Sequence, residues 1–168
     1  MATKVIQAGS VRLNVGPLKA LTDDLKKYGQ HRINVGLFAD TGMRPTRSGK
    51  PMFYAELGFI HEFGCFTSHP PLPERSFLRI PLMNYLPAAI KATGPAQWKR
   101  AILQEGMLMA LTKLARLAST TVQEAFNSRG FGTWAPNAQR TIRRKHSSMP
   151  LIDTAKMRQA VTYRIVKA

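Results

Sequence analysis

The chain has 168 residues, with 25 Lys and Arg against nine Asp and Glu and a formal net charge of +16. This length is typical of one domain of about 100 to 200 residues, and a hydrophobic content of 44% argues against a wholly disordered chain. Cys65 is the only cysteine, which excludes an intrachain disulfide and a thiolate metal cluster. The sequence shows neither a signal h-region nor an apolar run of the about 18 to 20 residues that cross a bilayer, so we expect no export, no membrane insertion and folding in a reducing cytoplasm.

The N-terminal third predicts a strand, a helix and a second strand. Residues 11–15 alternate apolar and polar, residues 17–28 carry apolar side chains at helical spacing, and residues 31–38 alternate again. Since helix and strands follow one another closely, we expect them to pack as one β-α-β unit. Residues 40–52, rich in Gly and Pro, predict a mobile basic loop that contains Arg44, Arg47 and Lys50.

The middle of the chain predicts two helices on either side of a proline-rich connection. Residues 53–63 have apolar side chains three and four apart and precede Gly64, which favours a short helix. Residues 67–73 contain three prolines and predict an extended or turn connection. Residues 76–90 are apolar enough for a helix that Pro81 and Pro87 break or bend.

Residues 96–127 predict the longest helix, about 45 Å long if unbroken. Leu108 and Leu117 lie off its main apolar stripe, which either a neighbouring subunit or a wide intrachain core explains. A Gly-rich loop over residues 128–133, a polar helix over 137–145 and a strand over 160–166 complete the chain. The predicted fold is a single α+β domain over residues 1–168, with a small antiparallel or mixed sheet packed against one long helix and several short helices.

The positive charge is concentrated toward the C-terminus. From Arg129 onward there are nine Lys and Arg against Asp153 alone, a net of +8 and half of the total charge. Such an excess favours nucleic acid or an acidic protein surface as a partner, although a solvated basic face is the alternative. A run of cations on a short helix suits phosphate contact without reading sequence. The candidate residues for contact with DNA or an acidic partner are Arg44, Arg47, Lys50, Arg140, Arg143, Arg144 and Lys145.

Signals for catalysis and metal binding are weak. His61-Glu62 resembles the start of a zinc-protease helix, but the second histidine that this motif needs is replaced by Cys65. A zinc site or a nucleophile at His61, Cys65 and His69 lacks a fourth ligand and an evident general base, so packing or hydrogen-bonded side chains are the alternative. The acidic residues form no catalytic pair. We therefore expect neither enzymatic activity, nor a metal, nor any other cofactor.

Five short motifs, taken in order, resemble the tail-completion or neck proteins of tailed bacteriophages, often called virion morphogenesis proteins. They are IHEFG at 60–64, LPERSFLR at 72–79, WAPNAQRTIRRK at 134–145, PLIDT at 150–154 and MRQAVTYRI at 157–165. The match spans roughly residues 53 to 166. The family usually has Pro at the position of Ser76 and Gly at that of Ala155.

The resemblance implies a non-enzymatic subunit that forms a homo-oligomeric ring, commonly sixfold, at the junction of head and tail. It implies assembly in the host cytoplasm, a place in the neck of the virion, and contact with head-closure or connector proteins, with tail terminator or tail tube proteins, and with genomic DNA in the channel. The alternative is an autonomous nucleic-acid-binding protein without sequence preference.

The motifs also suggest roles for particular side chains. Arg75 and Arg79 flank Phe77, a pattern suited to a subunit contact, and Trp134 suits either such a contact or the core. Asp153 or Thr154 is suited to cap a short helix that begins near Ala155. The candidate interface residues are Arg75, Phe77, Arg79, Leu108, Leu117 and Trp134.

Overall fold

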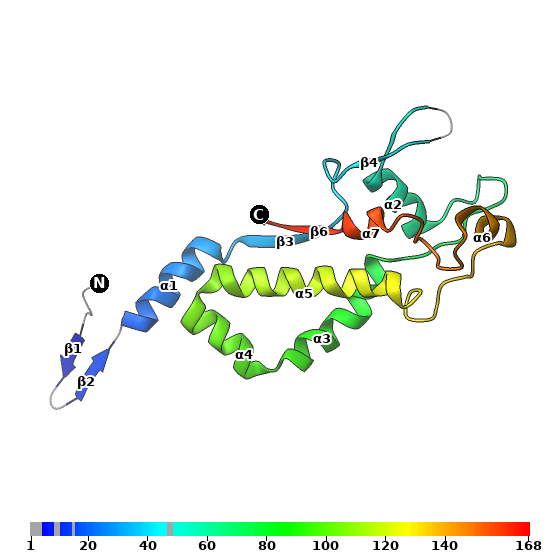
Figure 1. Cartoon of the computed structure of the whole chain (residues 1–168). Helices are drawn as coiled ribbons and strands as arrows, with labels where there is room; N and C mark the ends of the chain where they lie inside the picture. The colour runs from blue at the N-terminus through cyan, green and yellow to red at the C-terminus, as the bar shows by residue number, and fades with distance from the viewer. Residues whose placement is uncertain (1–4, 9–10, 15, 47–48) are drawn as a thin grey trace.

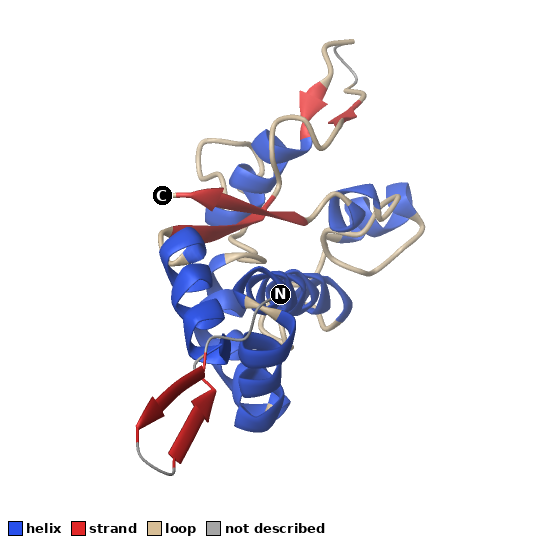
Figure 2. Ribbon diagram, turned by 90° about the vertical axis from the view of Figure 1, so that its left-hand side faces the viewer, coloured by secondary structure: helices blue, strands red, loops and turns tan. Residues whose placement is uncertain are grey.

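A computed structural model of the chain describes residues 5–8, 11–14, 16–46 and 49–168. Strands β1 (Val5–Ala8) and β2 (Val11–Asn14) form an antiparallel hairpin that projects from one end of the molecule (Figures 1 and 2). Helix α1 (Gly16–Tyr28) leads from this hairpin toward the rest of the fold. The strand and helix predicted here are confirmed, whereas β1 was not predicted.

The predicted β-α-β unit is wrong, because the strands on the two sides of α1 belong to different sheets. Strand β2 pairs with β1, and β3 (His31–Gly36) pairs antiparallel with the C-terminal strand β6 (Thr162–Lys167). The short connection lets β2 pair with β1 as a local hairpin, and β3 instead pairs with β6 along one edge.

Helix α5 (Met107–Asn127) is the centre of the fold. The β3–β6 sheet lies on one side of it, and helices α3 (Leu86–Thr93) and α4 (Pro95–Arg100) lie on the other (Figure 1). Its C-terminal half carries Val122 and Phe126 into the core, where the ring of Phe126 contacts those of Phe77 and Trp134 at centroid distances of 5.0 and 6.0 Å. The predicted α+β class, with a small sheet on a long helix, is confirmed.

The predicted continuous helix over residues 96–127 is wrong. Gly106 adopts φ 92, a left-handed conformation that glycine enters without a Cβ clash, and the chain reverses there (Figure 1). Before it lie α4 and a π-helical turn (Ala101–Glu105), and after it α5 runs back for 21 residues, about 31 Å. Asp24 of α1 accepts the N–H of Met107 at 2.9 Å and so caps the start of α5.

The two prolines of residues 76–90 shape the helix as predicted. Residues 81–85 form a π-helical turn in which Leu86 donates its N–H to the carbonyl of Pro81. Pro87 then lies in the first turn of α3 and, because it lacks an N–H, donates no hydrogen bond to the preceding turn.

The remaining elements surround one end of α5. Strands β4 (Met43–Arg44) and β5 (Met52–Phe53) form a short ladder within the predicted basic loop, and helix α2 (Tyr54–Phe63) follows. Helices α6 (Gln139–Lys145) and α7 (Lys156–Gln159) lie near α2 (Figure 1). The predicted cap of α7 by Asp153 or Thr154 is wrong: Ala155 precedes the helix at φ 58, and Asp153 instead pairs with Arg44 at 2.9 Å.

Candidate interaction site around helix α2

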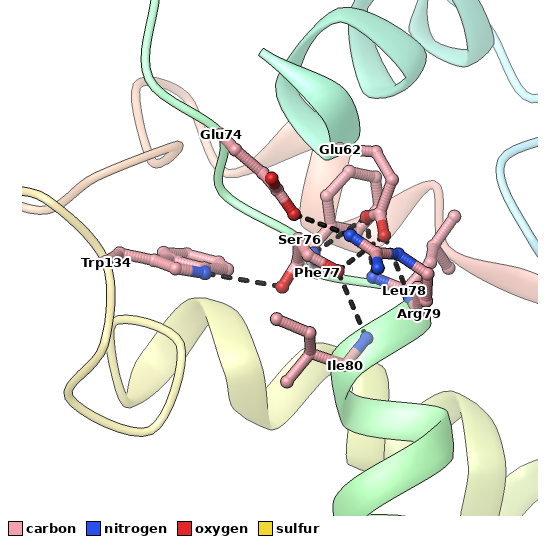
Figure 3. A network of polar contacts seen from close by, with 8 residues as sticks. All are labelled: Glu62, Glu74, Ser76, Phe77, Leu78, Arg79, Ile80 and Trp134. Carbon is pink, nitrogen blue, oxygen red and sulfur yellow. Dashed lines mark hydrogen bonds and ion pairs between the residues drawn. The ribbon is translucent and has the colours of Figure 1, made fainter.

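Helix α2 presents a buried carboxylate to the core. Glu62 is 4% exposed, and its two oxygens accept hydrogen bonds from the hydroxyl of Ser76 at 2.5 Å and from three successive backbone N–H groups, those of Phe77, Leu78 and Arg79, at 2.8 to 2.9 Å (Figure 3). These N–H groups lie at the start of a helical segment, where a negative charge is stabilised. Glu62 therefore fixes the second motif against α2.

The third motif joins the same network. The indole N–H of Trp134 donates to the carbonyl of Ser76 at 3.3 Å (Figure 3). The guanidinium of Arg75 donates to the carbonyls of Ala135 and Pro136 at 3.0 to 3.2 Å. Three motifs far apart in the sequence thus form one buried polar cluster with its hydrogen bonds satisfied.

Beside this cluster lies a hollow of about 270 Å³, which we call the basic hollow. Its walls come from α2, the proline-rich connection, α6 and the segment that leads into α7, so all five motifs contribute to it. Its charged lining consists of five cations, Arg44, Arg75, Arg144, Lys145 and Lys156, and one acid, Asp153. The hollow is therefore strongly positive.

His61 also lines the basic hollow, from the same helix as Glu62. Burial, followed by the positive charges of Arg75, Lys145 and Arg44, lowers the pKa of His61 to about 4. Both causes disfavour the imidazolium, so His61 is neutral at pH 7. Its Nδ1 is buried and has no hydrogen-bond partner within the described part of the chain.

Two of the predicted interface residues are core residues. Phe77 is 0% exposed and packs against Phe126, so its predicted role at a subunit contact is wrong. Trp134, for which a core and a contact role were both open, is buried beside it. Arg75 is buried and bonded to backbone carbonyls, so its main partners are intrachain, although it also lines the basic hollow.

The other candidate interface residues are accessible. Arg79 is half exposed and pairs with Glu74 at 2.6 Å, and Leu108 is 44% exposed on α5. Leu117 lines a second, more open hollow of about 310 Å³ together with Trp98 and Arg116.

The cations of α6 are divided between two surfaces. Arg144 and Lys145 line the basic hollow, whereas Arg140 and Arg143 are exposed and do not line it. Arg44 lines the hollow as well, and the exposed Lys50 does not. Arg47 lies outside the described residues. The sequence did not single out Lys156, because only the fold brings it beside α6.

Large apolar side chains are also exposed on α2 and in the turn that follows it. Phe59 and Phe63 on α2 are 67% and 50% exposed with their rings 5.0 Å apart, and Phe66 in the following turn is 79% exposed. In the sequence, the four-residue spacing of Phe59 and Phe63 indicates that they share a helical face, but it does not say whether that face is buried or exposed. Exposed aromatic groups of this kind are typical of interaction surfaces.

The residues of the weak metal and nucleophile alternatives are His61, Cys65 and His69. The thiol of Cys65 lies 3.5 Å from the hydroxyl of Thr67, and hydrogen bonds from this neighbour and from Ser68 lower its pKa. Among the described residues, no three His, Cys, Asp or Glu side chains are grouped so that they could hold a metal ion. Within the same residues, no helix combines the length and the apolar character needed to cross a membrane.

Comparisons with models of protein families, with curated proteins and with solved structures find no match to this chain.

Proposed function

We propose that this chain is a non-enzymatic structural protein of a tailed-phage virion, which forms a homo-oligomeric ring at the neck and joins the completed tail to the head connector. The observation that carries the proposal is the convergence of the five family-like motifs. Separated by as many as about a hundred residues, all five supply residues to the basic hollow. A shared site gives a physical reason for the motifs to occur together.

The physical roles within the motifs support an assembly function. Glu62, Ser76 and Trp134 hold the site rigid from inside, and the side chains that remain accessible are cations and aromatics. A rigid scaffold that displays Phe59 and Phe66 has the character of an interaction surface, since buried aromatic anchors contribute much of the energy of protein interfaces.

The test is the mass and shape of the assembled species. Native mass spectrometry and electron microscopy are applied to the purified chain, first alone and then mixed with head or tail parts of the phage whose genome encodes it. We expect a closed ring at the neck that contains several copies of the chain. A chain that neither forms a ring nor joins either part would refute the proposal.

A matched pair of variants sharpens this test. Phe59→Ser combined with Phe66→Ser removes two exposed aromatics without opening the core and should reduce assembly. Met83→Ser removes an equally exposed apolar side chain, 68% accessible, from another element and serves as the control. Equal assembly of both variants would argue against a role for the phenylalanines.

Sequence-nonspecific nucleic-acid binding is the second candidate function. It is favoured by Arg140 and Arg143, which are exposed on α6 and have no ion-pair partner among the described residues. This function predicts retention of duplex DNA at about 0.1 M salt, with affinity that falls steeply as salt rises. If an Arg140→Gln, Arg143→Gln variant binds DNA as tightly as the unaltered chain, these residues do not carry it.

A further inference from the structure

We propose that the basic hollow is a docking site for an acidic peptide segment of a different protein, whose carboxylates enter between α6, α7 and the proline-rich connection. The choice of a protein ligand rests on the proposed function. The binding chemistry follows from the charges, partners and shape of the hollow.

Four of the five cations of the hollow form no ion pair within the part of the chain that the structure describes. Asp153 is the only acid in its lining and already pairs with Arg44 at 2.9 Å. Lys145 donates to the carbonyl of Met149 at 3.2 Å, and burial is the main cause that lowers the pKa of its ammonium group. Half-buried cations without acidic partners are costly, and a bound carboxylate offsets that cost.

Two cations are free to contact a ligand. Arg144 of α6 and Lys156 of α7 line the hollow from different elements, and in the described ranges neither side chain has an ion-pair or hydrogen-bond partner. A guanidinium and an ammonium that converge on one recess favour carboxylates, which accept bonds from both. His61 adds a neutral polar side chain to the same lining, not a further charge.

The shape of the hollow favours a protruding side chain over a duplex. Pro70, Pro71, Pro73 and Pro136 contribute to its walls, so part of the lining has a fixed backbone φ. Duplex DNA presents its phosphates along an extended surface, which the exposed Arg140 and Arg143 outside the hollow suit better. Carboxylates at the ends of side chains can instead enter a recess.

A second copy of the chain has no suitable segment to offer. Of the nine acidic residues, the structure gives eight an intrachain hydrogen bond or ion pair, and within the described part of the chain Asp23 alone has neither. The acidic residues also occur singly except for Asp23 and Asp24, and Asp24 caps α5. The carboxylates must therefore come from a heterologous partner.

The test uses the full chain and a capped hexaglutamate peptide, measured by titration calorimetry at about 0.1 M salt. We expect one peptide per chain. Arg144→Gln with Lys156→Gln should weaken binding by about tenfold or more, because both charges contact the ligand. The matched control, Arg140→Gln with Arg143→Gln, makes the same change in net charge outside the hollow and should weaken binding by less than about twofold.

Three results would overturn the inference. The first is that the peptide does not bind at millimolar concentration, and the second is that both double variants lose the same peptide affinity. The third is that Arg144→Gln with Lys156→Gln weakens the binding of duplex DNA but not that of the peptide. Unfolding curves of the variants establish that each is folded. A chain that joins the neck ring but does not bind the peptide contradicts only this inference. A chain that binds the peptide through the hollow but never enters a virion contradicts only the proposed function.

Discussion

Replacing Glu62 with glutamine tests whether its carboxylate holds the second motif in place. Four donors converge on the two oxygens: Ser76 and Arg79 on Oε1, and Phe77 and Leu78 on Oε2. An amide nitrogen replaces one oxygen, so two of the four donors face N–H groups instead of an acceptor. Hydrogen bonds to a charged group are worth about 1.5 to 3 kcal/mol each, and losing two predicts a loss of about 3 to 6 kcal/mol in the free energy of unfolding. That is a large share of the total stability of a small protein, about 5 to 15 kcal/mol.

The assay is denaturant unfolding followed by tryptophan fluorescence, since Trp134 donates to Ser76 within the same cluster. Glu74→Gln is the matched control, because it makes the same chemical change in an exposed ion pair. The side chain of Glu74 is 45% exposed, and that of its partner Arg79 is 50% exposed. Exposed ion pairs contribute about 0 to 1 kcal/mol, so this variant should remain close to the unaltered chain. If Glu62→Gln is no less stable than Glu74→Gln, the proposed role of the buried carboxylate is wrong.

Further predictions concern backbone conformation and pH. Gly130→Ala should lower the free energy of unfolding by about 2 to 4 kcal/mol, because the new Cβ would lie 2.2 Å from the indole of Trp134 and the residue has φ 67. Gly132→Ala is the control: it has φ 83 but open space around the Cβ, so it should lose only about 1 to 2 kcal/mol from the left-handed backbone. Equal losses in the two variants would exclude the clash. Ala155→Gly should raise the free energy of unfolding by about 0.5 to 1 kcal/mol in the same assay. Glycine removes the backbone strain of alanine at φ 58, and this gain exceeds the loss from a more flexible unfolded chain. A lower stability of the variant would contradict this. His61 binds a proton in the unfolded chain below about pH 6.5 but in the folded chain only near pH 4, so unfolding free energy should fall by about 3 kcal/mol as pH drops through that window. A His61→Asn variant should lack this part of the pH dependence, and an unchanged profile would refute the assignment.

The elements that the sequence predicted well are those whose pattern and ends agree. Helix α1 has apolar positions at helical spacing between Pro17 and Gly29, and β6 has a run of β-branched and aromatic residues. The break at Gly106 was missed because apolar side chains continue at helical spacing on both sides of it. A single glycine inside such a pattern is compatible with a helix, and only the antiparallel packing of α5 against α3 and α4 requires the turn.

The candidate site was predicted only in part, because its parts meet through long-range contacts. The sequence located the cations of α6 and Arg44, but it could not separate those that line the hollow from Arg140 and Arg143. The sequence predicted Phe77 at an interface because Arg75 and Arg79 flank it, a pattern that suits an apolar side chain at a subunit contact. Whether Phe77 faces a neighbour or the core depends on Glu62, which holds its backbone N–H from a separate helix.

Ser76 and Ala155 differ from the residues usual in the proteins that the five motifs resemble. At Ala155 the chain keeps the left-handed turn that glycine would favour, with Asp153 held by Arg44 two residues before it. At Ser76, where the family usually has proline, the hydroxyl donates to Glu62 and accepts the N–H of Ile80 at 3.1 Å, so it takes part in the cap that begins the helix.

The positive charge of the chain acquires a structural meaning from the placement of its acids. Glu62 and Asp24 are used to cap helices, and Asp40, Glu74, Glu105 and Asp153 are used in ion pairs with nearby Lys or Arg. The acids thus stabilise the fold and leave four of the five cations of the hollow without an ion pair among the described residues. The proposed docking of an acidic segment in the hollow would use these unpaired cations.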